Sequence, residues 1–89
     1  MADLAKIQTV IADIAQRGKN VKLSEIEWVM EQLRQHGYDV SSRDARHGKL
    51  FRVDSQRFMV NHHNPGSNKV KAYSVQDFVS AMIELGLYE

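Results

Sequence analysis

The chain has 89 residues and a formal net charge of +1, with 43% hydrophobic and 26% charged residues, and this composition argues against intrinsic disorder. Cysteine is absent, which excludes disulfides and thiolate metal sites. The start lacks the layout of a secretory signal, and no apolar run reaches the about 18 residues that suggest a membrane helix. We therefore expect one domain, residues 1–89, that is soluble, cytoplasmic and not bound to a membrane.

The first predicted element is a helix over residues 3–17. Its apolar residues follow the three- and four-residue spacing of one helix face, Asp3 stands at the N-cap position, and Gly18 follows the end. An alternative role for this helix is a protein-interaction surface, because an exposed apolar face would drive self-association. The residues of that face are Ile7, Ile11 and Ile14.

A second helix is predicted to begin at Ser24, which would form a capping box with Glu27, and to end at Gly37. Leu23 and Trp28 stand at the two positions of a hydrophobic staple across that cap. The buried stripe of this helix is expected to consist of Ile26, Val29, Met30 and Leu33.

From residue 38 the apolar period changes to two, which predicts an antiparallel meander. The first strand is expected over residues 38–43, the second contains residues 51–53, and the third covers residues 58–62. Residues 44–48 and 54–56 form the two predicted turns.

Residues 64–68 have turn chemistry, and residues 69–72 add at most a short edge strand. A last helix is predicted to begin at Ser74 and to end at Gly86, after which Leu87 folds back on the core. The order is helix, helix, three strands, helix. This order predicts an α+β fold in which helices cover one face of a three-stranded antiparallel sheet.

Positive charge is concentrated in the middle of the chain. Residues 43–71 carry seven Lys and Arg against two Asp, a net +5, whereas residues 1–42 carry −1 and residues 72–89 carry −3. Such a segment is a candidate surface for a polyanion, and the alternative is a solvated strand face. The candidate nucleic-acid-binding residues are Arg43, Arg46, Lys49, Arg52, Arg57, Lys69 and Lys71.

Three of the four histidines lie in the same segment. Histidine exchanges protons near neutrality because its ordinary pKa is about 6.5, and RNA supplies its own nucleophile, the 2′-hydroxyl. A metal-independent ribonuclease therefore needs a base, an acid and cations on the phosphate. His47, between Arg46 and Lys49, fits the role of proton carrier. The alternative is an exposed turn histidine without a function.

His62 and His63 are the candidates for the second acid or base. Neighbours on a strand point to opposite faces, so both are not expected to join one site, and the register decides which one approaches His47. His62 would share the face of Phe58 and Val60, which makes a core-edge imidazole the alternative. No spacing typical of a metal site and no phosphate-binding loop is present, so we expect neither a metal nor a cofactor.

Four stretches combine this element order with short motifs: Leu-Arg-Gln-His-Gly-Tyr at 33–38, Arg-His-Gly-Lys-Leu-Phe at 46–51, Arg-Phe-Met-Val-Asn-His-His at 57–63, and residues 78–87. They resemble the HicA-type mRNA interferase toxins, whose fold is similar to a double-stranded-RNA-binding domain. The resemblance covers residues 24–87, so the helix over 3–17 would be an addition. Because Ala45 and Arg46 replace the small residues that commonly precede the family's histidine, the chain would be an outlying member.

The resemblance implies that His47 is the catalytic residue, that single-stranded mRNA is the substrate, and that a cognate antitoxin protein covers the site. The alternative is a module of the same fold that binds nucleic acid without cleaving it. That alternative predicts an affinity that falls steeply with salt, because each neutralised phosphate releases counterions. The oligomeric state is left open by the sequence.

Overall fold

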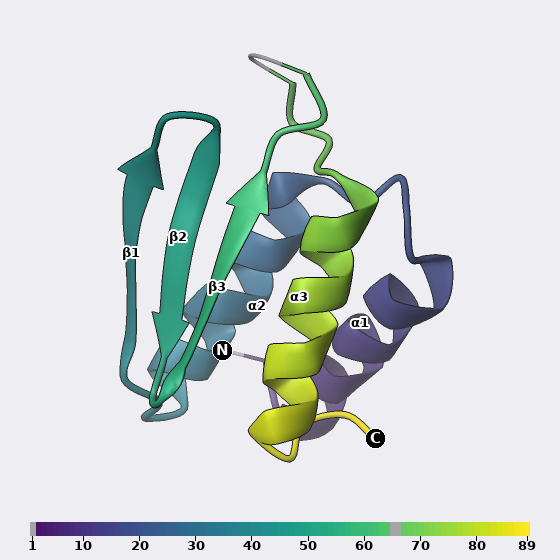
Figure 1. The fold of residues 1–89 in the computed structure, drawn as a ribbon. Coiled ribbons are helices and arrows are strands. Elements are labelled where there is room, and N and C mark those ends of the chain that lie inside the picture. Colours follow the sequence, from purple (N-terminus) through teal and green to yellow (C-terminus); the bar gives the residue numbers. More distant parts are fainter. Residues whose placement is uncertain (1, 65–66) are drawn as a thin grey trace.

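Three helices and one antiparallel sheet make up the described part of the chain, residues 2–64 and 67–89 of the computed structural model (Figure 1). The elements are α1 (Leu4–Arg17), α2 (Leu23–Gln35), β1 (Val40–Ala45), β2 (Gly48–Val53), β3 (Gln56–Asn61) and α3 (Ala72–Glu84). Their order and the mixed α+β class confirm the prediction. Within these residues, no helix combines the length and the apolar character needed to cross a membrane.

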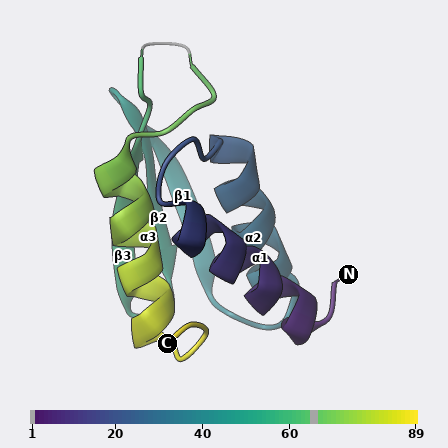
Figure 2. The same ribbon diagram turned by 90° about the vertical axis from the view of Figure 1, so that its right-hand side faces the viewer.

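The helices lie on one side of the sheet, whose strand order is β1-β2-β3 (Figure 2). Phe51 of β2 pairs with Phe58 of β3, and their rings stack with centroids 5.4 Å apart. Phe58 also meets Phe78 of α3 edge-on at 5.7 Å, which joins the sheet to the helix layer. Helix α1 packs across α2 and α3 on the side away from the sheet, so the core lies between three layers (Figure 2).

Helix α1 has the bounds that its local signals predict. The Asp3 side chain accepts a hydrogen bond from the backbone N–H of Lys6 at 2.8 Å, and Gly18 ends the helix with φ +66°. The apolar face of α1 is fully buried against the rest of the core, so the interpretation of this face as a self-association surface is wrong. The buried residues are Ile7, Ile11 and Ile14.

The predicted start of α2 at Ser24 is wrong, because Lys22 is the N-cap residue. Glu25, three residues after the cap, accepts a hydrogen bond from the Lys22 backbone N–H at 2.8 Å. The box of Ser24 with Glu27 is therefore not formed. Leu23 lies inside the helix, where it cannot take the first position of a staple.

A partner far along the chain explains the earlier start of α2. The backbone carbonyl oxygen of Asn68 accepts a hydrogen bond from the Leu23 N–H at 2.6 Å. The side-chain oxygen of Asn68 accepts one from the Ser24 N–H at 3.3 Å. Free N–H groups at a helix start need such acceptors. Local sequence signals cannot reveal an acceptor 44 residues away. At the other end, Gly37 follows the helix with φ +96°, as predicted.

Helix α3 also begins earlier than predicted, with Lys71 as its N-cap residue instead of Ser74. Ser74 lies inside the helix and is fully buried, and its hydroxyl accepts the backbone N–H of Asn61 at 2.9 Å. The predicted end is confirmed: Gly86 has φ +76°, and Leu87 is buried against the core.

The strands differ from the prediction mainly at the first turn. Strand β1 begins and ends two residues later than expected, which leaves only Arg46 and His47 in the turn before β2. The second turn contains Asp54, with φ +52°, and Ser55. Two of the residues in the predicted turn over 64–68 are 65 and 66, which lie outside the described residues. The predicted short edge strand is reduced to single bridges made by Lys69 with Lys22 and by Val70 with His62.

Candidate functional site

The β1–β2 turn is held at the end of the sheet by its pairing with the chain after β3. Gly48 and Asn61 form the last pair of the β2–β3 ladder. One residue further, the His47 carbonyl oxygen accepts the backbone N–H of His62 at 2.8 Å. The ladder therefore continues to these two histidines, which lie opposite each other.

Gly48 permits this close pairing because no side chain fits at its position. A Cβ there would overlap the carbonyl oxygen of Val60 and would lie 2.8 Å from the Cα of Asn61. Both are backbone atoms of the paired strand, so they cannot move aside as a flexible side chain would. The residue after His47 thus fixes how near the turn lies to the end of β3.

An open cleft of about 420 Å³ lies at this end of the molecule. Its walls come from the β1–β2 turn, from the end of β3 and the residues that follow it, and from the start of α3, which Figure 1 shows near one another. The lining residues are Arg46, His47, Asn61, His62, His63, Lys71 and Tyr73. All three predicted catalytic residues and two of the predicted cations are thereby brought together.

The three imidazoles of the cleft differ in burial. His47 and His63 are exposed, whereas His62 is half-buried and its Nδ1 has no hydrogen-bond partner among residues 2–64 and 67–89. The expectation that His62 and His63 cannot join one site is wrong. Strand β3 ends at Asn61, and the backbone bends at His63, whose N–H donates to the Lys69 carbonyl oxygen at 2.7 Å, so strand alternation no longer separates the two rings.

The cations of the cleft are Arg46, which is exposed, and Lys71, which is half-buried. In the described part of the chain, neither forms an ion pair with a carboxylate. The Lys71 ammonium lies 5.8 Å from the centre of the Tyr73 ring, within the range of a cation–π interaction. Both positive charges are therefore available to an anion that enters the cleft.

Sequence reasoning missed two residues of the cleft, Asn61 and Tyr73. The Asn61 side-chain amide donates to the Tyr73 hydroxyl at 2.9 Å, and the backbone carbonyl oxygen of Asn61 accepts the backbone N–H of Lys71 at 3.0 Å. Tyr73 remains 50% exposed. The available signal was an aromatic residue two positions after Lys71, because aromatic side chains among cations are typical of nucleic-acid-binding surfaces.

Lys49 does not belong to the cleft, so its predicted place beside His47 is wrong. Alternation along β2 places it on the face of Phe51, beneath α2, where its ammonium donates to Glu27 Oε2 at 2.8 Å. The side chain is only 25% exposed. The hydrogen bond to Glu27 raises the pKa of Lys49 and outweighs the burial that lowers it. This cation is neutralised within the fold.

The remaining predicted cations also lie outside the cleft. Arg43, Arg52 and Arg57 lie on the sheet face that the helices leave open, where they line a hollow of about 280 Å³. Lys69 is exposed but does not line the cleft. The other predicted basic residues therefore divide into two surfaces, and Lys49 and Lys69 belong to neither.

Comparison of the chain with known protein families, with curated proteins and with solved structures finds no match. Over residues 2–64 and 67–89, no group of three or more His, Asp or Glu side chains is placed to hold a metal ion. The chemistry of the cleft follows from its own side chains. Imidazoles in reach of solvent can exchange protons near neutrality, and the cations beside them can hold an anion.

Proposed function

We propose that this protein is a small RNA-cleaving enzyme of the HicA-like mRNA interferase kind, with His47 as the essential proton carrier. The observation that supports the proposal most is the shared cleft, in which His47 and His63 are exposed beside Arg46 and Lys71. A base, an acid and charges for the phosphate are what RNA cleavage without a metal ion needs.

The reaction uses the nucleophile that RNA contains. The 2′-oxygen forms a bond to the adjacent phosphorus, and the bond from phosphorus to the 5′-oxygen breaks. One imidazole takes the 2′-hydroxyl proton, and a second, protonated imidazole gives a proton to the leaving 5′-oxygen. We assign these roles to His47 and His63, because both rings are exposed. Each proton transfer contributes roughly 10²–10⁴-fold to the rate.

Arg46 and Lys71 are assigned to the phosphate, whose negative charge grows during the attack. Preformed charges at that position stabilise the transition state more than the ground state. The ring of His62 is less exposed than those of His47 and His63. The backbone N–H of His62 donates to the His47 carbonyl oxygen, and the backbone N–H of Asn61 donates to the Ser74 hydroxyl. In this proposal His62 has a positioning role, through the contact of its backbone with the turn.

A second candidate function is RNA binding without cleavage. The cations outside the cleft favour it, because Arg43 and Arg57 would hold phosphate groups that no imidazole reaches. In either case the partner is single-stranded RNA in the cytoplasm. The resemblance to HicA-type toxins further implies a cognate antitoxin protein that covers the cleft.

The test is cleavage of single-stranded RNA by the purified chain in EDTA. We expect His47→Ala to lower the rate by about 100-fold or more, and His63→Ala to lower it in the same range. His36→Ala is the matched control, since that ring lies at the end of α2 with its Nε2 2.7 Å from the Ala2 carbonyl oxygen. It should cleave at the wild-type rate.

A substrate with deoxyribose throughout should stay intact, because it lacks the nucleophile. Wild-type cleavage rates for His47→Ala in EDTA would show that the catalytic assignment is wrong. Intact RNA after long incubation with a wild-type protein that binds it would instead favour the binding module.

A further inference from the structure

We propose that the open face of the sheet binds the part of a single-stranded RNA that extends out of the histidine cleft. This inference rests on the proposed function and adds a second binding surface to it. The open face carries nine positions, three from each strand, since successive residues of a strand alternate between the two faces. The strand register arranges them in three rows.

The rows run from the cleft toward the opposite end of the sheet. The first row contains Ala45, Gly48 and Asn61, the second contains Arg43, Leu50 and Met59, and the third contains Ser41, Arg52 and Arg57. Asn61 also lines the cleft, so the two surfaces are continuous. Gly48 has no side chain and Ala45 has only a methyl group, so neither projects far from the sheet where the cleft opens onto it.

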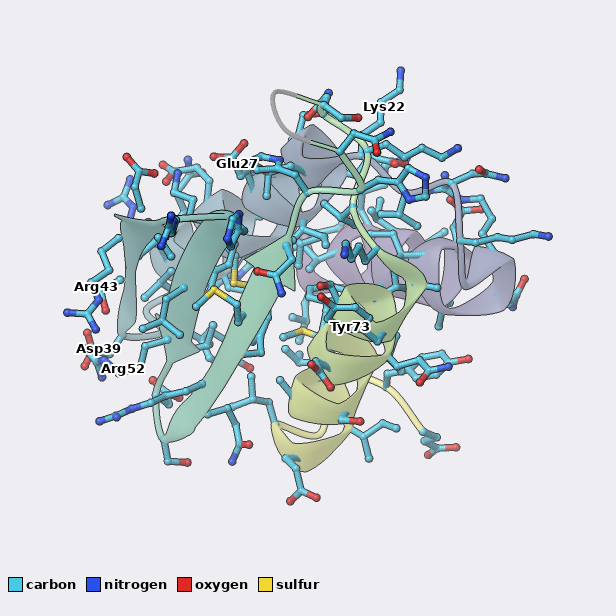
Figure 3. The ribbon with its side chains drawn as sticks, turned by 45° about the horizontal axis from the view of Figure 1, so that its top comes forward. Lys22, Glu27, Asp39, Arg43, Arg52 and Tyr73 are labelled. Carbon is cyan, nitrogen blue, oxygen red and sulfur yellow. The ribbon has the colours of Figure 1, made fainter. Side chains whose placement is uncertain are left out.

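The charge of this face suits a polyanion. None of its nine residues is acidic, and three are arginines. Arg52 is neutralised by Asp39, whose Oδ2 lies 3.1 Å from its Nη1 (Figure 3). Arg43 and Arg57 are exposed and form no ion pair among the residues that the structure describes, and Figure 3 shows Arg43 pointing outward.

Apolar side chains lie between these charges. Leu50 and Met59 occupy neighbouring strands in the middle row and are half-buried. The hollow of about 280 Å³ on this face is lined by Leu50 together with all three arginines. Surfaces that bind single strands combine cations that follow the sugar-phosphate backbone with aromatic groups on which the bases stack. Here Leu50 and Met59 offer the bases an apolar contact in place of aromatic rings.

Continuity with the cleft favours RNA over an acidic protein as the occupant. From Asn61 to Arg57 along β3 the chain rises about 13 Å, at about 3.3 Å per residue. A strand of RNA held by its phosphate between Arg46 and Lys71 would cross the low first row and then reach Leu50. Its next phosphates would meet Arg43 and Arg57. A rigid duplex has its bases paired, and they could not contact the apolar row.

The experiment measures binding of non-cleavable 2′-O-methyl oligonucleotides, so that it does not depend on activity. We expect the double variant Arg43→Ala, Arg57→Ala to bind a decanucleotide at least about ten-fold more weakly than wild type. Its log–log dependence on salt should become shallower by about 1.4, because each lost phosphate contact removes about 0.7 from the slope. Cleavage of a natural dinucleotide, which is confined to the cleft, should be unchanged.

Two further variants separate charge from other effects. Lys6→Ala, Lys19→Ala removes the same charge from exposed positions on and beside α1 and should bind the decanucleotide as wild type does. Arg43→Lys, Arg57→Lys keeps the charge and should retain the wild-type salt slope. Circular dichroism and the unfolding midpoint establish that each variant is folded.

Wild-type affinity of the Arg43→Ala, Arg57→Ala variant for the decanucleotide would overturn the inference, and an acidic protein would then be the occupant to test. Slower dinucleotide cleavage by that variant would also overturn it, because the arginines would then act in the cleft. A protein that cleaves nothing would end the proposed function, but the binding measurement would still decide the role of the open face.

Discussion

His47 and His62 face each other at the end of the β2–β3 ladder, joined by the hydrogen bond from the His62 N–H to the His47 carbonyl oxygen at 2.8 Å. The position of the His47 side chain therefore depends on backbone pairing. The bond joins backbone atoms only, and the imidazole of His47 is exposed to solvent. Changes that separate β2 from β3 at this end should affect the cleft before they affect the core.

Gly48→Ala is expected to be the most damaging small change near the cleft. Its methyl group would overlap the Val60 carbonyl oxygen, so the end of the β2–β3 ladder must open. We expect a loss of about 3 kcal/mol in the free energy of unfolding, measured by urea denaturation. Loss of the His47–His62 hydrogen bond should appear as faster amide exchange at His62.

Gly86→Ala provides the comparison. Gly86 has φ +76°, but a Cβ there would contact nothing within 4 Å. Backbone strain alone costs about 1–2 kcal/mol at such a position. Equal losses for the two variants would mean that the close approach of β3 to Gly48 does not exist in solution.

Ser74→Ala tests the link between α3 and the cleft. Ser74 is fully buried, and its hydroxyl is the acceptor for the backbone N–H of Asn61. The change removes this acceptor, so the Asn61 N–H becomes unsatisfied. We expect unfolding to become easier by about 1–3 kcal/mol. Ser80→Ala, at an exposed position of the same helix, should change the free energy of unfolding by less than about 0.5 kcal/mol. Similar values for both would exclude a structural role for the Ser74 hydroxyl.

The sequence was sufficient where an element is determined by neighbours along the chain. Helix α1 is such a case, because Asp3 and Gly18 supply both of its ends. The starts of α2 and α3 could not be predicted, because they depend on hydrogen bonds to residues elsewhere in the fold. Asn68 accepts backbone N–H groups at the start of α2, and Asn61 is hydrogen-bonded to Lys71 and Ser74 at the start of α3. Propensity and capping rules contain no information on such distant partners.

The candidate site shows the same division. Arg46 and His47 could be placed in an exposed turn because turn chemistry is local. The face occupied by Lys49 could also have been deduced, because it stands two residues before the buried Phe51 on one strand. The pairing of Asn61 with Tyr73 needed the structure, since it depends on where the start of α3 lies against the end of β3.

The pair Lys49→Met and Arg46→Met distinguishes a structural cation from one available to RNA. Lys49 donates to Glu27 beneath α2, so its replacement should cost at most about 1 kcal/mol of stability and leave RNA affinity unchanged. Arg46 lines the cleft without an ion pair among the described residues, so its replacement should weaken RNA binding and reduce the salt slope by about 0.7. Binding assays on both variants at two salt concentrations provide the measurement. The reverse pattern of affinities would contradict the placement of both residues.

Glu25→Gln should destabilise the protein at neutral pH and much less in acid. Burial raises the pKa of Glu25, but hydrogen bonds from the Arg17 side chain and the Lys22 backbone N–H outweigh it, so the pKa lies below its ordinary value of 4.5. A carboxyl with a depressed pKa in the folded state stabilises above its unfolded pKa, and this stabilisation disappears as pH falls through the folded pKa.

The difference in free energy of unfolding between wild type and Glu25→Gln should thus be at most about 1 kcal/mol at pH 7, because the side chain is 32% exposed and the ion pair is screened. This difference should shrink as the pH falls below 4.5, the ordinary pKa of a glutamate side chain. Urea denaturation at pH 7 and in acid measures both. Glu84→Gln, at an exposed position in the last turn of α3, should not lower stability at pH 7. A difference for Glu25→Gln that stays constant across this range would mean that the carboxylate charge makes no contribution there.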